Sequence, residues 1–177
     1  MIAIHVSPVI DTPRLRLRPP RRRDAARIAE LANDPGVAKM TSRMPYPYAV
    51  ADAEAFLARA SEKDAAREAV FALDHPDEGV IGMLGFHPNG DGRAELGYWL
   101  GRPYWGSGYA TEAARAALDW AKSDWRRRLV VAGHFADNDA SGRVLCKAGF
   151  LYTGEVKRMY SLARTADVPA RMMVWLA

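Results

Sequence analysis

The chain has 177 residues, which predicts a single domain, residues 1–177, large enough to bury a substantial core. Hydrophobic residues make up 49% and charged residues 26%, a globular composition that excludes wholesale disorder. No apolar run approaches the roughly 20 residues of a transmembrane helix, so we expect no membrane partner. The net charge of +4 fits an anionic small molecule. Nucleic acid is the weaker alternative, because the arginine runs alternate with apolar residues or precede helical patterns, and we expect no nucleic-acid partner.

Cys146 is the sole cysteine, which excludes an intramolecular disulfide. No clustered Cys/His spacing indicates a zinc site, so we expect no metal. These features favour a reducing cytoplasm. With no histidine near it in sequence, Cys146 is expected to be an inert thiol, buried or partly buried, and not a nucleophile.

The chain alternates strand-like and helix-like segments, which predicts a mixed α/β domain. Alternating apolar and charged residues predict a first strand at 14–18, and amphipathic patterns predict helices at 24–33 and 51–60. The loop 41–48 between them holds Tyr46 and Tyr48. Further predicted elements are strands at 69–73, 79–86 and 93–100, a long alanine-rich helix at 109–123, a strand at 129–135, a helix at 138–148, and strands at 150–161 and 171–175.

The segment 95–112 carries the chemistry. A strand ends near Leu100, and a short loop containing Gly106-Ser107-Gly108 leads directly into the long helix. Such a loop presents free backbone N–H groups at the positive end of a helix dipole, an arrangement suited to phosphate or pyrophosphate. No G-K-[ST] follows, which excludes a P-loop, and Thr111 departs from the dinucleotide fingerprint. Taken alone, the loop is equally compatible with a plain turn.

A second motif lies one strand further along. The pair E-x-G-Y-W-x(6)-G-x-G-Y-A-T-E, from Glu95, and N-x-x-S-x(5)-K-x-G-F, from Asn138, resembles the GNAT superfamily of acyl-CoA N-acyltransferases. The chain looks most like the branch of the ribosomal-protein N-terminal alanine acetyltransferases, and the likeness spans about residues 11–175. The resemblance implies an α/β (α+β) fold with a mixed, mostly antiparallel central sheet of six to seven strands and about four helices. Two parallel strands would splay apart to form the acyl-CoA cleft.

The resemblance also implies acetyl-CoA as co-substrate. Backbone amides of Trp105, Gly106, Ser107, Gly108, Tyr109 and Ala110 would hold its pyrophosphate, with Thr111 at the helix start and Asn138 near the pantetheine or thioester. Two positions depart from the family pattern. Pro103 stands where the family usually has Gln or Arg, with Arg102 one step earlier, and Leu145 stands where a proton-donating Tyr is common.

Amine acetylation calls for a base and for protonation of the departing thiolate. Glu95 is the candidate base, because strand alternation places it on one face with Gly97 and Trp99; a solvent-facing strand glutamate is the alternative. Ser141 is the candidate acid in place of the missing Tyr; the alternative is a first-turn serine that stabilises its helix. Asn138 is a catalytic candidate whose alternative, compatible role is a helix cap.

Tyr46, Tyr48 and Trp99 are expected to wall the acceptor pocket, with simple packing as the alternative. The predicted activity is direct transfer of an acetyl group to a primary amine in a ternary complex. The acceptor is a protein N-terminal α-amine, an amino acid or another small amine, and the basic excess favours one that is not strongly cationic. The alternative is a catalytically silent acyl-CoA-binding module of the same fold. A homodimer is possible on general grounds.

Overall fold

The computed structural model describes residues 8–177, so the first seven residues of the expected domain lie outside the described part. One eight-stranded sheet forms the centre, in the order β1-β2-β3-β4-β5-β6-β8-β7. The strands are β1 (Ile10–Asp11), β2 (Arg16–Arg18), β3 (Ala69–His75), β4 (Gly79–Pro88), β5 (Ala94–Leu100), β6 (Leu129–Phe135), β7 (Leu151–Ser161) and β8 (Ala166–Leu176). The α-helices are α1 (Ala25–Ala32), α2 (Pro35–Ala38), α3 (Val50–Ser61), α4 (Tyr109–Ser123) and α5 (Asp139–Lys147), and two 3-10 turns cover Arg22–Asp24 and Arg102–Tyr104.

The mixed, mostly antiparallel sheet confirms the predicted fold class, with a strand count of eight where six to seven were expected. The additional strand is β1, whose two residues are too few to show a periodic pattern. β8 begins five residues earlier than expected. Pro169 interrupts the strand-like sequence pattern, which led to the later predicted start, yet in the structure it is paired with Arg158. α4 and β6 match their predicted bounds.

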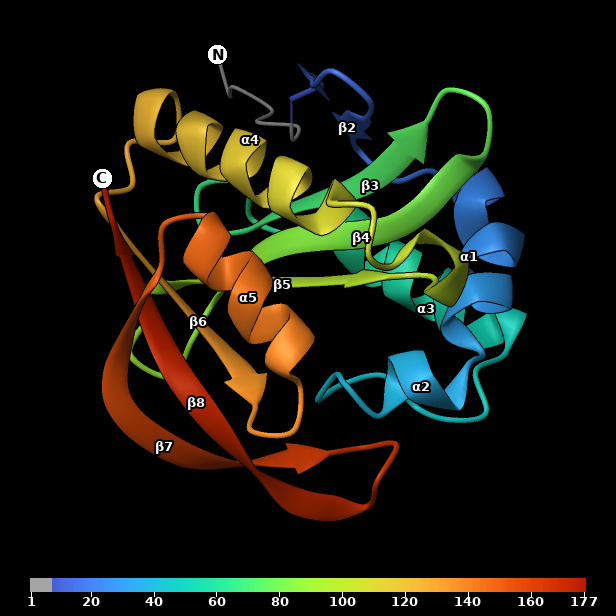
Figure 1. Ribbon diagram of the computed structural model, residues 1–177. Helices are drawn as coiled ribbons and strands as arrows, with labels where there is room; N and C mark the ends of the chain where they lie inside the picture. Colours follow the sequence, from blue (N-terminus) through green and yellow to red (C-terminus); the bar gives the residue numbers. More distant parts are fainter. Residues whose placement is uncertain (1–7) are drawn as a thin grey trace.

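Two apolar clusters cover the two faces of the sheet. α4 and α5 pack on one face, where six small or apolar side chains of α4 are buried as predicted: Ala110, Ala113, Ala114, Ala117, Leu118 and Ala121. α1, α2 and α3 pack with Met44 and Tyr48 against the other face. Figure 1 shows α4 and α5 in front of the sheet and α3 behind it.

β5 and β6 are the parallel pair, and they separate from one another. They share one register pair, Glu95 with Val131, whereas β5 pairs with β4 along its whole length. Beyond Glu95 the edge of β5 therefore opens toward the carboxyl ends of the two strands. This confirms the splayed arrangement that the family resemblance implies.

The turn between β7 and β8 reaches across the molecule to the segment after α2. The Leu162 N–H donates to the Ser42 carbonyl at 2.9 Å, and Arg164 Nε donates to the Lys39 carbonyl at 2.7 Å. Arg164 also makes two hydrogen bonds to the carboxylate of Asp137, in the turn before α5. The hairpin thus ties together two segments on either side of the opening between β5 and β6.

Candidate active site

A cleft of about 1240 Å³ passes through this opening. Its lining comes from both faces of the sheet: Phe56 and Tyr48 on the α3 side, and Ala110 and Ser141 on the α4–α5 side. The side chain of Glu95 lines the cleft at the point where the two strands part. A ligand placed in it can therefore bridge the two faces.

The glycine loop at one end of the cleft has six consecutive unused backbone donors. Within residues 8–177, the N–H groups from Gly106 to Thr111 make no hydrogen bond, and the first bonded amide is that of Glu112, to the Gly108 carbonyl. Gly106 and Gly108 have φ values of +76° and +82°, which favour glycine. Free N–H groups at a helix start attract anions, as the sequence predicted. Of the predicted loop residues, Trp105, Gly106 and Ala110 line the cleft, while Ser107, Gly108, Tyr109 and Thr111 form the adjoining turn.

Arg14 supplies a positive charge beside this loop that sequence reasoning missed. Its Nη1 donates to the Ser107 carbonyl at 2.9 Å, and its Nε donates to Glu112 at 2.7 Å. Glu112 also accepts from the Thr12 hydroxyl at 2.7 Å. Burial raises the pKa of Glu112, but these hydrogen bonds outweigh it and lower the pKa overall. Arg14 lies in a run of alternating charged and apolar residues, which indicates a strand. This pattern does not predict the contacts of Arg14 with Ser107 and Glu112.

Like Arg14, Arg102 is already paired with a carboxylate. Its guanidinium makes two 2.7 Å hydrogen bonds to the carboxylate of Asp34, whose pKa falls to about 2, mainly because of the side-chain hydrogen bond from Arg102. The guanidinium also lies 5.3 Å from the centre of the Trp105 ring. Among residues 8–177, the donors that remain without a partner at the loop are therefore backbone N–H groups.

Ser141 lies next to Tyr98 of β5, which was not among the predicted site residues. The two hydroxyl oxygens are 2.7 Å apart. Burial raises the pKa of Tyr98 to about 12, despite the opposing hydrogen bond with Ser141, so the phenol stays protonated at neutral pH. Asn138 caps α5 by accepting the Ser141 N–H at 3.2 Å, which confirms its cap role. Leu145 is buried in the core, away from any catalytic position.

Glu95 lies on the other side of the opening, in register with His87 of β4. Burial raises the pKa of Glu95, although the positive charges of Arg43 and Lys157 act against this. Burial also lowers the pKa of His87 to about 4, so this imidazole is neutral at physiological pH. A partly buried carboxylate with a raised pKa suits a base for an ammonium group.

The predicted acceptor wall is partly assembled. Tyr48 and Trp99 line the cleft, and both pack with the cluster on the α3 side. Tyr46 is 46% exposed and is not among the cleft-lining side chains. Its place in substrate binding stays a prediction.

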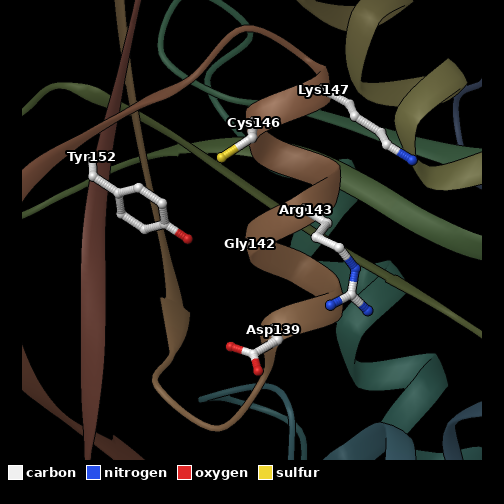
Figure 2. Close-up of a pocket in the computed structure, with 6 residues that line it drawn as sticks. All are labelled: Asp139, Gly142, Arg143, Cys146, Lys147 and Tyr152. Atoms are coloured by element: carbon white, nitrogen blue, oxygen red, sulfur yellow. The ribbon is translucent and has the colours of Figure 1, made fainter.

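A shallower pocket lies along α5, shown in Figure 2. The Arg143 and Lys147 side chains extend from one side of the helix, and the Tyr152 ring and Cys146 sulfur lie on the other. Cys146 is exposed, so the expectation of a buried or partly buried thiol was wrong. α5 is amphipathic, and its buried positions are taken by Gly142 and Leu145.

His134 is buried beneath α5, and both ring nitrogens have partners. Nδ1 lies 2.8 Å from the Phe135 carbonyl, and Nε2 lies 2.9 Å from the Tyr152 hydroxyl. Gly142 leaves the room for this pair, since a Cβ there would lie 2.6 Å from the Tyr152 oxygen. A larger residue at position 142 would therefore clash with the His134–Tyr152 pair.

Among residues 8–177, no helix is long and apolar enough to cross a membrane. The same residues contain no group of three or more His, Cys, Asp or Glu side chains that could hold a metal ion.

The fold places a cleft between two splayed parallel strands, with a loop of backbone amides that are unbonded within residues 8–177 at one end and Glu95 where the strands part. Residues 14–151 match the family model described as an acetyltransferase (GNAT) domain. The chain is 31% identical over 159 residues to the uncharacterized N-acetyltransferase YoaA of Bacillus subtilis, covering 85% of this chain and 87% of YoaA. The protein therefore belongs to the GNAT family of acetyl-CoA-dependent N-acetyltransferases.

Solved structures share the fold. RimJ of Mycobacterium smegmatis, in complex with CoA-disulfide, superposes with a TM-score of 0.82 at 22% identity, covering 96% of this chain and 88% of RimJ. The ribosomal-protein-S5-alanine acetyltransferase of Vibrio fischeri gives a TM-score of 0.81 at 18% identity, covering 96% and 97%. These likenesses show that the chain shares its fold with both enzymes.

Proposed function

We propose that this enzyme transfers the acetyl group of acetyl-CoA directly to a primary amine while both substrates occupy the cleft. The main observation in support is the cleft between β5 and β6, which has backbone N–H groups without hydrogen-bond partners in the described part of the chain at one end and Glu95 at the other. An extended cofactor can enter from the α4–α5 face and present its thioester to an amine on the α3 face. We place this single-domain enzyme in the cytoplasm, where its lone exposed cysteine stays reduced.

The donor half would bind CoA through the loop and α5. The amides of Gly106 to Thr111 would hold the pyrophosphate, and Arg14, which is paired with Glu112, holds the loop through the Ser107 carbonyl. Arg143 and Lys147 provide exposed cations on α5 for a further phosphate. Bound CoA supplies an activated thioester, and the chain supplies orientation and proton transfer.

Glu95 would take a proton from the substrate ammonium, leaving a neutral amine. The nitrogen lone pair then forms a bond to the thioester carbonyl carbon. The carbon–sulfur bond breaks, and its electron pair goes to sulfur, which takes a proton from the Ser141 hydroxyl. Tyr98, 2.7 Å away, returns a proton to Ser141 and is left as a phenolate. The second proton, which the attacking nitrogen loses, passes through water to this phenolate, and Glu95 releases the first proton to solvent. Asn138 holds the first turn of α5, and therefore Ser141, in place.

Two measurements test this mechanism. Thermal unfolding with and without acetyl-CoA reports cofactor binding, and release of free CoA thiol across a panel of amines and short peptides reports transfer. We expect Ser141→Ala and Tyr98→Phe each to lower kcat by about a hundredfold, the lower end of general acid catalysis. The stabilisation by acetyl-CoA should stay unchanged in both variants.

Ser61→Ala, at the exposed end of α3, is the matched serine control and should behave as wild type. Wild-type turnover in Ser141→Ala would contradict the role of the hydroxyl. Stabilisation by acetyl-CoA with no thiol release from any amine would favour the silent binding module. An absence of stabilisation at saturating acetyl-CoA would contradict the assignment of the glycine loop.

A further inference from the structure

The acceptor end of the cleft contains more charged side chains than the proposed chemistry uses. Asp52 accepts the Ala49 N–H at 2.8 Å and thereby caps α3. Lys63 forms an ion pair with Glu68. These groups already have partners, so neither is free to bind the charge of a ligand.

Arg43 and Arg59 differ from these groups. Both line the cleft and are exposed, and within residues 8–177 neither makes an ion pair or a side-chain hydrogen bond. Arg43 lies in the segment after α2 and is close enough to Glu95 and His87 to lower the pKa of each. Arg59 lies on α3, and its positive charge acts to lower the pKa of Tyr48. This end of the cleft therefore holds two guanidinium groups without an ion-pair partner among the described residues, alongside the carboxylates of Glu95 and Asp52.

Between these charges the wall is apolar. Phe56, Met83, Met44 and Trp99 line the cleft together with Tyr48, and all five pack with the cluster on the α3 side. A carboxylate base, a nearby guanidinium and an apolar wall therefore surround one volume. Together they complement a molecule that carries an ammonium group, an anionic group and an apolar body.

We propose that the acceptor is an apolar amine whose molecule also carries a carboxylate, bound by Arg43 with Arg59 while its ammonium faces Glu95. The proposal rests on the amine-acetylating function proposed above and names its substrate class. Guanidinium binds carboxylate through two parallel hydrogen bonds, which fixes orientation as well as affinity. A free apolar α-amino acid has these groups, and so does a peptide whose N-terminal residue is apolar and is followed by an acidic side chain.

The test compares acceptors that differ only in charge. Thiol release is measured with L-phenylalanine, L-leucine and L-methionine, with their C-terminal amides, and with Phe-Glu and Phe-Gln peptide amides. The variants are Arg43→Gln and Arg59→Gln. Arg93→Gln is the control, because it removes the same charge from an exposed turn outside the cleft.

We expect the carboxylate acceptors to exceed their neutral counterparts by at least about tenfold in kcat/KM, chiefly through KM. Arg43→Gln should reduce this preference to about threefold or less, with Arg59→Gln having the smaller effect and Arg93→Gln none. A preference for free acids over Phe-Glu identifies amino acids as the source, and the reverse preference identifies peptides. Equal use of acids and amides by the wild type, or an equal loss for both in Arg43→Gln, would overturn the proposal. That result would leave the acetyltransferase function intact, whereas failure of that function shows as loss of stabilisation by acetyl-CoA.

Discussion

Arg164 offers the sharpest test of how the acceptor side is built. In Arg164→Ala the turn between β7 and β8 loses its hydrogen bonds to the Lys39 carbonyl and to both carboxylate oxygens of Asp137. It also loses the contact with the Phe135 ring, 5.1 Å away. Hydrogen bonds involving charged groups contribute about 1.5–3 kcal/mol each when shielded. Asp137 is more than half exposed, so solvent screening reduces its part to that of a surface ion pair.

The bond to the Lys39 carbonyl is exposed as well, so the expected loss in the free energy of unfolding is about 1 kcal/mol, from one ordinary hydrogen bond and a surface ion pair. Urea unfolding measures it. Because the segment after α2 carries Arg43, we expect KM for the acceptor to rise while the stabilisation by acetyl-CoA is retained. The glycine loop, at the far end of the cleft, has no contact with this turn.

Arg158→Ala is the matched control on the same hairpin, where the guanidinium donates to the Asp167 carbonyl within the β7–β8 pair. It should change neither KM nor unfolding by more than a few tenths of a kcal/mol. Equal acceptor KM in Arg164→Ala and wild type, despite the loss of stability, would refute the idea that this turn shapes the acceptor site. Weakened acetyl-CoA binding with unchanged acceptor KM would refute it as well.

Three further predictions concern the loop, the core and the base. Gly108→Ala and Gly79→Ala should each cost about 1–2 kcal/mol in unfolding free energy, since both have positive φ, but only Gly108→Ala should weaken acetyl-CoA binding in a thermal-shift titration. Arg18→Ala leaves the carboxylate of Asp24 buried without its bidentate partner and should cost about 3–5 kcal/mol in urea unfolding. Burial raises the pKa of Asp24, but its hydrogen bonds outweigh burial and lower the pKa overall. The ionised Asp24 carboxylate therefore contributes its full stability above the ordinary carboxyl pKa, and this stability is lost as pH falls through the lower pKa of the folded state. The unfolding free energy of Arg18→Ala should consequently depend less on acid pH than that of the wild type. Burial raises the pKa of Glu95, so the acid limb of the wild-type profile of kcat/KM against pH should lie above the usual carboxyl range. In Glu95→Gln this limb should disappear together with most of the rate. An unchanged pH profile would exclude Glu95 as the base.

Local patterns predicted the elements whose own residues determine them. α4 was predicted to the residue, because its alanines repeat at helical spacing and Gly108 precedes it. Tyr98 was not predicted as a site residue, and its ring packs against the core cluster on the α4–α5 side of the sheet. Its hydroxyl nevertheless meets Ser141, 43 residues later, and no spacing rule encodes that contact. The first half of β8 was missed for a similar reason. In sequence Pro169 indicates the end of a strand, whereas in the structure it is paired with Arg158 of β7.

The same distinction separates the two halves of the cleft. The proposed donor half consists of the backbone of one continuous loop and the first turn of one helix, so two short motifs were sufficient to predict it. The proposed acceptor half consists of side chains from segments that come together only in the folded chain, including Arg43, Arg59 and Glu95. The identity of the acceptor therefore has to be sought in the charges that face Glu95, and these became visible only in the folded structure.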